Sequence, residues 1–421
     1  MRKTMTIWIA MLLSAASIHA QGTTTADDVL TTLRRANDYF MAKYADPTRA
    51  TYVKKVRPSS LWTRAVYYEG LMALNDIDPQ QRYLDYVDRW AEFHQWTPRD
   101  GVNTCDADNQ CCAQTYLMRY MQVGGEEKLL PTRQNLDHQL LTPNLKLVPK
   151  NEWETAKANA KNLYGWWTWI DAIQMAMPVY AQMTTITGEK KYFEHAMKMY
   201  CWTRDTLAGG LFNEKEGLWW RDKDFIPPYQ EPDGRQCYWS RGNGWVYAAL
   251  VRVMESLTPI PSPKGEGSTK VQGAKVEGSN ALRAFNGSSL LRKDFIKMSK
   301  ALLQCQREDG LWNVSLVSRN YEGKELTGTS LFLYGLSWGI RNGLLPAKKY
   351  RAACDRAWQA LQRDCVHADG FLGWVQGTGK EPKDGQPLSY TRVPDFEDFG
   401  TGCFLLGGSE YYKLLKQGVS K

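Results

Sequence analysis

Asp171 is the residue of this sequence that is best placed to do acid–base chemistry. It lies between three tryptophans, Trp166, Trp167 and Trp169, and the apolar run that follows it. A carboxyl group in apolar surroundings is difficult to ionise, so its pKa rises, as a general acid requires. Taken alone, this local sequence favours a plainer role, in which Asp171 caps a helix or points to solvent.

A second pair of carboxylates precedes Asp171 in the chain. Asp106 and Asp108 stand in the stretch VNTCDADNQCCAQTYLMRY, just before a predicted helix with an apolar face. Two such residues are also an ordinary way to cap a helix. Because the cleavage of glycosidic bonds generally uses two carboxylates, one of them could face Asp171 across a cleft.

A third group of candidates occurs in the stretch QCYWSRGNGWV. Its Arg241 lies between Trp239 and Trp245, and two glycines follow that let the backbone approach a ligand closely. A guanidinium offers a planar fork of donors that matches a carboxylate or hydroxyls. The indoles could flank it as stacking faces for a sugar. The same residues also fit a structural cation–π contact, in which Arg241 only packs on indole.

Helices must position these residues, because helical periodicity recurs through almost the whole chain and alternating strand patterns are few. Breaker residues separate roughly twelve predicted helices. Paired helices of about 30 residues per hairpin, with recurring aromatic connectors, predict an all-α fold, an (α/α)6 barrel whose loops converge on a central cleft. An irregular all-α bundle is the alternative. The predicted helices span 26–44, 59–75, 79–96, 110–123, 131–141, 168–187, 189–207, 241–257, 292–307, 328–342, 347–364 and 398–416.

The N-terminus has the pattern of a secretory signal peptide. Residues 1–20 combine a basic start, an apolar run and small residues up to Ala20, which predicts cleavage after Ala20. The apolar run is short for a bilayer span. We therefore expect an exported protein without membrane insertion after signal removal, in the periplasm or alternatively outside the cell or at its surface. Residues 21–421 are expected to form one catalytic domain, with a flexible Gly- and Ser-rich loop at about 259–289.

Composition narrows the class of partners. The chain has 421 residues, among them 17 Trp and 22 Tyr, which suit contacts with sugars but also a Trp-rich core. The net charge of +8 is spread without a dense basic block, so nucleic acid is a poor candidate partner. The nine irregularly spaced cysteines and few histidines show no zinc pattern, and we expect no metal and no cofactor. Nothing indicates the oligomeric state.

Matching blocks run in order from about Asp108 to Leu415, and five of them are WTWIDAIQMAMPVYA, GLWWRD, YWSRGNGWVYAALVRV, ELTGTSLFLYGLSWGIRNGLL and FGTGCFLLGGSEYYKL. This series resembles the unsaturated uronyl hydrolases, glycoside hydrolase family 105, which is related to family 88. The blocks Trp-x-Asp-x-x-x-Met and Trp-x-Arg-Gly-Asn-Gly-Trp are specific in combination.

The resemblance implies an (α/α)6 barrel with Asp171 as the main catalytic aspartate and Asp108 as its partner. Asn109 and Ala113 depart from the family pattern around Asp108, which leaves Asp106 as an alternative second carboxylate. A histidine that rhamnogalacturonan-type members often carry is missing from EGLWWRDKDF, where Arg221 could take over substrate binding. The predicted substrate-binding residues are Arg241, Trp239, Trp245, Asn243, Trp167, Arg221 and Asp106.

The implied reaction releases a terminal 4,5-unsaturated uronic acid from oligosaccharides made by polysaccharide lyases. Asp171 would protonate C4 of the C4=C5 double bond, and water would add at C5, with Asp108 holding water or substrate. Two other classes stay open: an inverting glycosidase that acts on saturated sugars through the same carboxylates, and a non-catalytic glycan-binding protein of the same fold. Neither the parent polysaccharide nor the leaving-group sugar can be read from the sequence.

Overall fold

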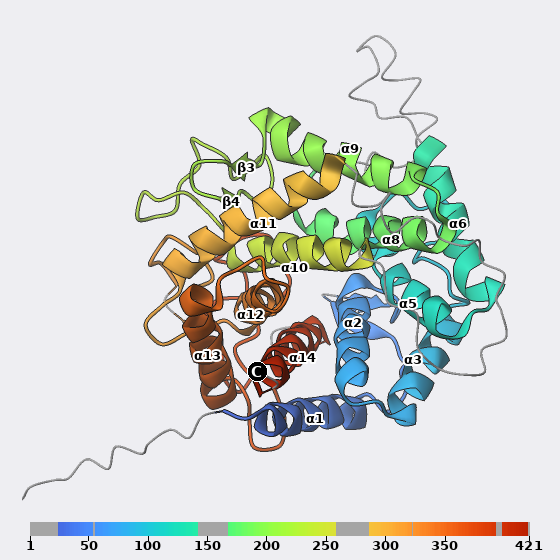
Figure 1. The fold of residues 1–421 in the computed structure, drawn as a ribbon, viewed down its shortest axis with the longest axis horizontal. Helices are drawn as coiled ribbons and strands as arrows, with labels where there is room; N and C mark the ends of the chain where they lie inside the picture. Colours follow the sequence, from blue (N-terminus) through green and yellow to red (C-terminus); the bar gives the residue numbers. More distant parts are fainter. Residues whose placement is uncertain are drawn as a thin grey trace, which may run out of the picture.

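The computed structural model describes residues 24–53, 55–141, 167–257, 286–321, 323–392 and 398–419. Long helices make up most of these ranges (Figure 1), and one short helix, α4, lies directly before α5 in the chain. Their bounds are α1 (Ala26–Lys43), α2 (Trp62–Ile77), α3 (Gln81–Phe93), α4 (Ala107–Gln110), α5 (Ala113–Val123), α6 (Glu126–Leu141), α8 (Asp171–Thr187), α9 (Lys191–Asp205), α10 (Ser240–Ser256), α11 (Asn286–Cys305), α12 (Leu326–Arg341), α13 (Ala347–Asp364) and α14 (Asp398–Val419).

Six of these helices form a closed inner ring. α2 contacts α5, and the contacts continue through α8, α10, α12 and α14 back to α2. The helices α1, α3, α6, α9, α11 and α13 pack around this ring (Figure 1). The predicted all-α (α/α)6 barrel is therefore confirmed. Two short antiparallel hairpins accompany it, β1 (Thr51–Val53) with β2 (Lys55–Arg57), and β3 (Phe212–Asn213) with β4 (Leu218–Trp219).

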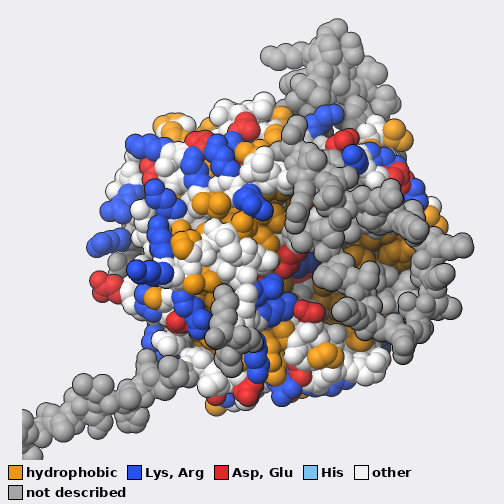
Figure 2. All heavy atoms as spheres, in the orientation of Figure 1, with side chains coloured by type: hydrophobic (Ala, Val, Ile, Leu, Met, Phe, Trp, Pro, Cys, Tyr) orange, Lys and Arg blue, Asp and Glu red, His pale blue; other side chains and the backbone are white. Residues whose placement is uncertain are grey.

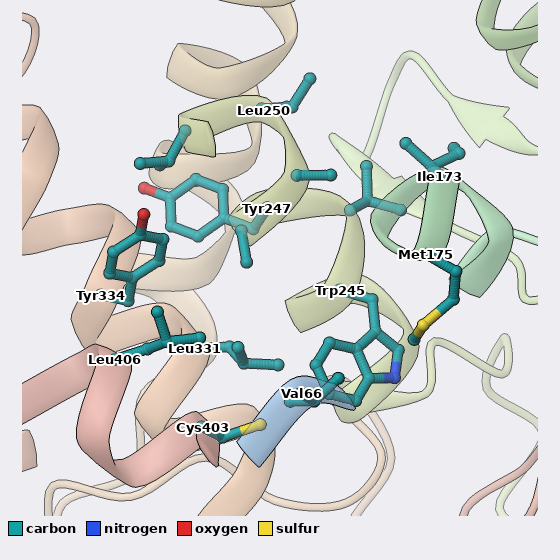
Figure 3. Packing of buried hydrophobic residues seen from close by; sticks show 14 of the residues in the cluster. Val66, Ile173, Met175, Trp245, Tyr247, Leu250, Leu331, Tyr334, Cys403 and Leu406 are labelled. Carbon is teal, nitrogen blue, oxygen red and sulfur yellow. The ribbon is translucent and has the colours of Figure 1, made fainter. Parts of the chain in front are cut away.

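Burial patterns explain why each helix takes its place. In the inner helix α12, every residue from 326 to 339 is buried, as expected for a helix with protein on all sides. The outer helix α3 buries only one stripe, which includes Tyr83, Val87 and Trp90 at helical spacing. Figure 3 shows how Val66, Trp245, Leu331 and Cys403 from four inner helices meet in the interior.

Glycines set how closely the first and last inner helices approach each other. A Cβ atom on Gly402 of α14 would lie 2.2 Å from the carbonyl oxygen of Val66 in α2. A Cβ atom on Gly70 would lie 2.4 Å from the carbonyl oxygen of Gly402. Because no side chain fits at such distances, these glycines allow the backbones of α2 and α14 to touch where the ring closes.

Three predicted helices differ from the observed ones by a division or by more than three residues at one end. The helix predicted for 110–123 is divided into α4 and α5. α6 begins at Glu126 and contains Pro131, which was predicted to be its first residue. The helix can include this proline because a proline near the start of a helix removes only one backbone hydrogen bond. α11 begins at Asn286, so residues 286–289 of the predicted loop are helical. The rest of that loop and the predicted signal peptide lie outside the described residues.

The inner helices all begin at the same end of the ring, because each follows an outer helix that runs in the opposite direction. Asp171 is the first residue of α8, and Arg241 is the second residue of α10. The candidate residues therefore gather at this end. In the described ranges no helix is both long and apolar enough to cross a bilayer. On the face shown in Figure 2, basic side chains are interspersed with acidic, polar and apolar ones.

None of the nine cysteines, all of which the structure describes, forms a disulfide, and seven of them are buried. Burial raises the pKa of the adjacent thiols Cys111 and Cys112, and this keeps both protonated and unreactive. Most of the cysteines therefore act as small buried hydrophobic residues.

Candidate active site

A cavity of about 760 Å³ opens at the end of the ring where the inner helices begin. Both carboxylates of the Asp106–Asp108 pair line it, and so does Arg221. Asp171 is connected to it through Arg221, whose Nε donates a hydrogen bond to Asp171 Oδ2 at 3.2 Å. The full lining is Asp106, Asp108, Thr168, Trp169, Leu207, Arg221, Asp222, Lys223 and Asp224.

The side chain of Asp171 is almost entirely shielded from solvent, with 8% of the residue exposed. Its burial raises its pKa, and the positive charges of Arg221 and then Arg241 act against that rise. It is not a helix cap, because the N-cap position of α8 belongs to Ile170. Asp171 thus has the environment of an acid whose charge state depends on its arginine neighbour.

Asp108 has the most strongly shifted pKa of the three aspartates. Burial of its carboxyl group, with the negative charges of Asp106 and Asp171, raises this pKa to about 8, against the opposing charges of Arg221 and Arg99. At neutral pH the unliganded site therefore keeps a proton on Asp108, while the charge of Arg221 favours the ionised form of Asp171. The two carboxyl groups influence each other, so they titrate as a pair.

Asp106 has the capping role that the sequence left open. It is the N-cap of α4, and its Oδ1 accepts a hydrogen bond from the backbone N–H of Asp108 at 3.0 Å. Burial raises its pKa, which this N–H and the charge of Arg99 partly offset. Because the cap fixes the first turn of α4, Asp106 holds Asp108 at the cavity while also lining it.

Arg221 is held between two carboxylates. Its Nε faces Asp171, and its Nη1 donates to Asp222 Oδ2 at 2.6 Å. The carbonyl oxygen of Arg221 accepts from the N–H of Ile170 at 3.0 Å, and Asp222 pairs with Trp169 in an isolated β-bridge. The segment that carries Arg221 is thereby fixed to the start of α8, and its guanidinium is aimed at Asp171.

Arg241 lies in the interior, with 1% of its surface exposed. Its Nη1 and Nη2 donate to the carbonyl oxygens of Gln376 and Gly377 at 2.7 and 2.8 Å. The guanidinium also stacks over the rings of Trp239 and Phe399, 4.6 and 5.0 Å from their centroids. The structural cation–π contact considered from the sequence is therefore present, and the fork of donors is occupied by the protein's own backbone.

Comparison with known proteins agrees with this fold. The model of Glycosyl Hydrolase Family 88 matches residues 32–415. The chain belongs to this family. It is accordingly a glycoside hydrolase, in keeping with the resemblance to the related unsaturated uronyl hydrolases.

Two curated relatives of this family 88 hydrolase carry the name unsaturated 3S-rhamnoglycuronyl hydrolase. The protein from Formosa agariphila is 29% identical over 361 residues, which are 84% of each chain. The protein from Alteromonas sp. (strain LOR) is 29% identical over 362 residues, which are 85% of this chain and 78% of the relative.

Solved structures show the same architecture. A family 88 glycosyl hydrolase from Bacteroides vulgatus superposes with a TM-score of 0.74 at 27% identity, covering 93% of this chain and 100% of the other. An unsaturated glucuronyl hydrolase from Streptococcus agalactiae gives a TM-score of 0.61 at 12% identity, with 93% of each chain covered. The second likeness concerns the fold alone.

Three further predicted binding residues of the family 88 hydrolase are buried away from the cavity. Asn243 bonds the backbone N–H and carbonyl of Trp219 at 2.8 and 3.0 Å, so it joins β4 to α10. Trp245 is fully buried, and its ring meets the edge of Trp62. Trp167 is also buried, and its carbonyl oxygen accepts from Thr203. The local sequence suggested that these three side chains are exposed to a ligand, but tertiary packing covers them. Their contact with substrate stays a prediction.

The structure adds residues that the sequence had not singled out for the site. Asp222, Lys223 and Asp224 line the cavity directly after Arg221. Trp169, rather than Trp167, contributes the half-buried indole. Asp222 is part of the motif GLWWRD, but the contact between Asp222 and Arg221 depends on the β-bridge from Asp222 to Trp169. Spacing along the chain does not reveal that bridge. Trp166 lies outside the described residues.

The shifted pKa of Asp108 predicts an effect on stability. Because the folded protein binds this proton more tightly than the unfolded chain, its free energy of unfolding falls as pH rises from about 4 towards 8. We expect Asp108→Asn to remove this fall, so that the variant gains stability over the wild type as pH rises. Urea unfolding at pH 4.5, 6 and 8 measures it. A stability difference that does not change with pH would contradict the assigned shift.

Proposed function

We propose that this hydrolase releases a terminal 4,5-unsaturated uronic acid from oligosaccharides by adding water across the C4=C5 double bond. The observation that carries the proposal is the cavity lined by Asp108 and Arg221, with Asp171 hydrogen-bonded to Arg221 beside it and the pKa of both aspartates raised. Membership of family 88 and the names of the two curated relatives support the same substrate class. Such sites need carboxyl groups that can be protonated near neutral pH.

The proposed chemistry begins with transfer of a proton from Asp171 to C4. The electron pair of the C4=C5 double bond forms the new C4–H bond, and the ring oxygen stabilises the positive charge left at C5. Water then adds to C5 while a carboxylate accepts its proton. The hemiketal formed in this way opens and releases the rest of the oligosaccharide.

Arg221 controls when Asp171 carries this proton. In the unliganded site its guanidinium favours the ionised form of Asp171. A substrate carboxylate that pairs with Arg221 would weaken that contact and add a negative charge nearby. Both effects raise the pKa of Asp171. Substrate binding would thus convert Asp171 into the proton donor.

The test is to incubate the purified protein with unsaturated oligosaccharides from several polysaccharide lyases. We expect the absorbance of the conjugated double bond to disappear as a shortened oligosaccharide is released. Matched oligosaccharides whose end sugar is saturated serve as controls and should stay intact. Cleavage of the saturated series would instead support the inverting glycosidase, and binding without cleavage would support the glycan-binding protein.

We also propose that the protein is exported and processed after Ala20, from the basic, apolar and small-residue order of residues 1–20. Mass spectrometry of protein from the periplasm or cell surface of the native cell should find a chain that starts at Gln21. The cytoplasmic fraction is the control. A chain from those compartments that still starts at Met1 would contradict the proposal.

A further inference from the structure

A second cavity, of about 820 Å³, opens at the same end of the ring as the first. It lies between the β3–β4 hairpin, the end of α11 and the segment that leads into α12. Since this segment connects the last turn of an outer helix to the first turn of an inner one, it belongs to the end where the catalytic candidates gather. None of the steps proposed above uses this cavity.

One short piece of chain separates the two cavities. Leu218 lines the second cavity and Arg221 lines the first. Three residues of extended chain span at most about 11 Å. The two cavities are therefore close enough for one oligosaccharide to reach both.

Trp220 stands on this dividing segment and is half-buried. Its ring stacks on that of Tyr238 with centroids 5.8 Å apart, and its Nε1 donates to Gln236 at 3.2 Å. Tyr238 is itself held by its neighbours, because its carbonyl oxygen accepts from the N–H of Leu316 at 2.9 Å. Trp220 thus offers a partly open indole in a fixed orientation on the segment that joins the two linings, as stacking on a sugar ring requires.

The lining of the second cavity fits a neutral polar ligand. Three arginines and three carboxylates contribute, so their formal charges cancel: Arg235, Arg307, Arg319, Glu216, Glu308 and Asp309. Arg307 is held by Asp309, and Arg235 by the carbonyl of Val317. The side chains of Glu216, Gln304, Glu308 and Arg319 are exposed.

We propose that the second cavity binds uncharged sugar residues on the leaving-group side of the oligosaccharide, with Trp220 as the stacking face between the cavities. Mixed donors and acceptors such as Gln304, Glu308 and Arg319 match sugar hydroxyls, which donate and accept. The balanced charge does not favour a polyanionic chain. The inference rests on the proposed function, because it assumes that an unsaturated uronic acid occupies the first cavity.

The test compares an unsaturated disaccharide with an unsaturated tetrasaccharide in which the two additional sugars are uncharged. For each protein we measure the ratio of kcat/KM for the tetrasaccharide to kcat/KM for the disaccharide. We expect the wild type to favour the tetrasaccharide, and Trp220→Ala and Arg319→Ala each to lower the ratio by about three- to tenfold, the range that a stacking contact provides. Because Trp220 adjoins Arg221, Trp220→Ala could also change cleavage of both oligosaccharides. For this variant only the ratio of the two kcat/KM values is therefore interpreted. Arg319→Ala tests the cavity independently.

Arg292→Ala, which removes an exposed arginine near the start of α11, is the matched control and should leave the ratio unchanged. Normal cleavage of the disaccharide with an unchanged ratio in both cavity variants would overturn the inference and leave the proposed function standing. Failure of the wild type to cleave either oligosaccharide would remove the proposed function and this inference with it.

Discussion

Replacing Asp171 by Asn should lower kcat by at least about a hundredfold, the usual contribution of a general acid. The amide keeps the shape of the carboxyl group and can still contact Arg221, but it has no proton to transfer to C4. Because Asp171 is buried at the first position of α8, and its burial opposes the charged form, the neutral amide should also leave the fold intact. Single-turnover kinetics, with circular dichroism of the same sample, tests both expectations.

Two controls make this result decisive. Asp85→Asn changes an exposed aspartate on α3 and should keep normal turnover. Asp108→Asn should lose less activity than Asp171→Asn, since an amide can still orient a water molecule. An Asp171 variant that keeps more than about a tenth of wild-type activity would exclude it as the donor. A larger loss in the Asp108 variant would move the donor role to Asp108.

Replacing Arg241 by Lys should lower the free energy of unfolding by about 3 kcal/mol, since two hydrogen bonds from a charged donor to buried carbonyls are disturbed. Lysine keeps the charge but cannot hold both Gln376 and Gly377 with one planar fork. Urea unfolding measures the loss. Arg235→Lys is the matched control, because Arg235 is exposed and donates to the carbonyl oxygen of Val317 at the surface. The stability of this variant should stay close to that of the wild type.

Kinetics of the same Arg241→Lys preparation tests the predicted contact with substrate. A binding role requires kcat/KM of the folded protein to fall by about tenfold to a hundredfold, which is about 1.4 to 2.7 kcal/mol of transition-state stabilisation. A destabilised variant with unchanged kcat/KM would make Arg241 a structural residue only. Unchanged stability would contradict the role of its two carbonyl contacts.

The helices could be predicted from the sequence because their apolar residues recur with helical spacing, as Tyr83, Val87 and Trp90 do in α3. The boundary between α4 and α5 could not, because the break at residues 111–112 has no glycine or proline to mark it. It matters for the site, since the separate turn of α4 is capped by Asp106 and presents Asp108.

The aspartates were accessible to sequence reasoning because a carboxyl group among aromatic and apolar residues is unusual. The binding residues were harder to place. Aromatic side chains beside glycines suggest an open loop, yet Trp239 and Trp245 are covered by residues distant in the chain, such as Gln376 and Trp62. Whether an indole faces a ligand or the interior depends on those partners, which local spacing cannot supply.

The closure of the ring between α2 and α14 has a consequence for how the chain acquires its structure. α14 contacts α1, α2 and α12, yet the ribosome makes it after all three. Until it emerges, the faces of α2 and α12 that it covers lack their partner, and the contacts between α2 and α14 cannot form. A nascent chain therefore stays incompletely folded at least until α14 has been made. A translocation machinery that accepts only unfolded polypeptides would find the chain in a suitable state throughout that time.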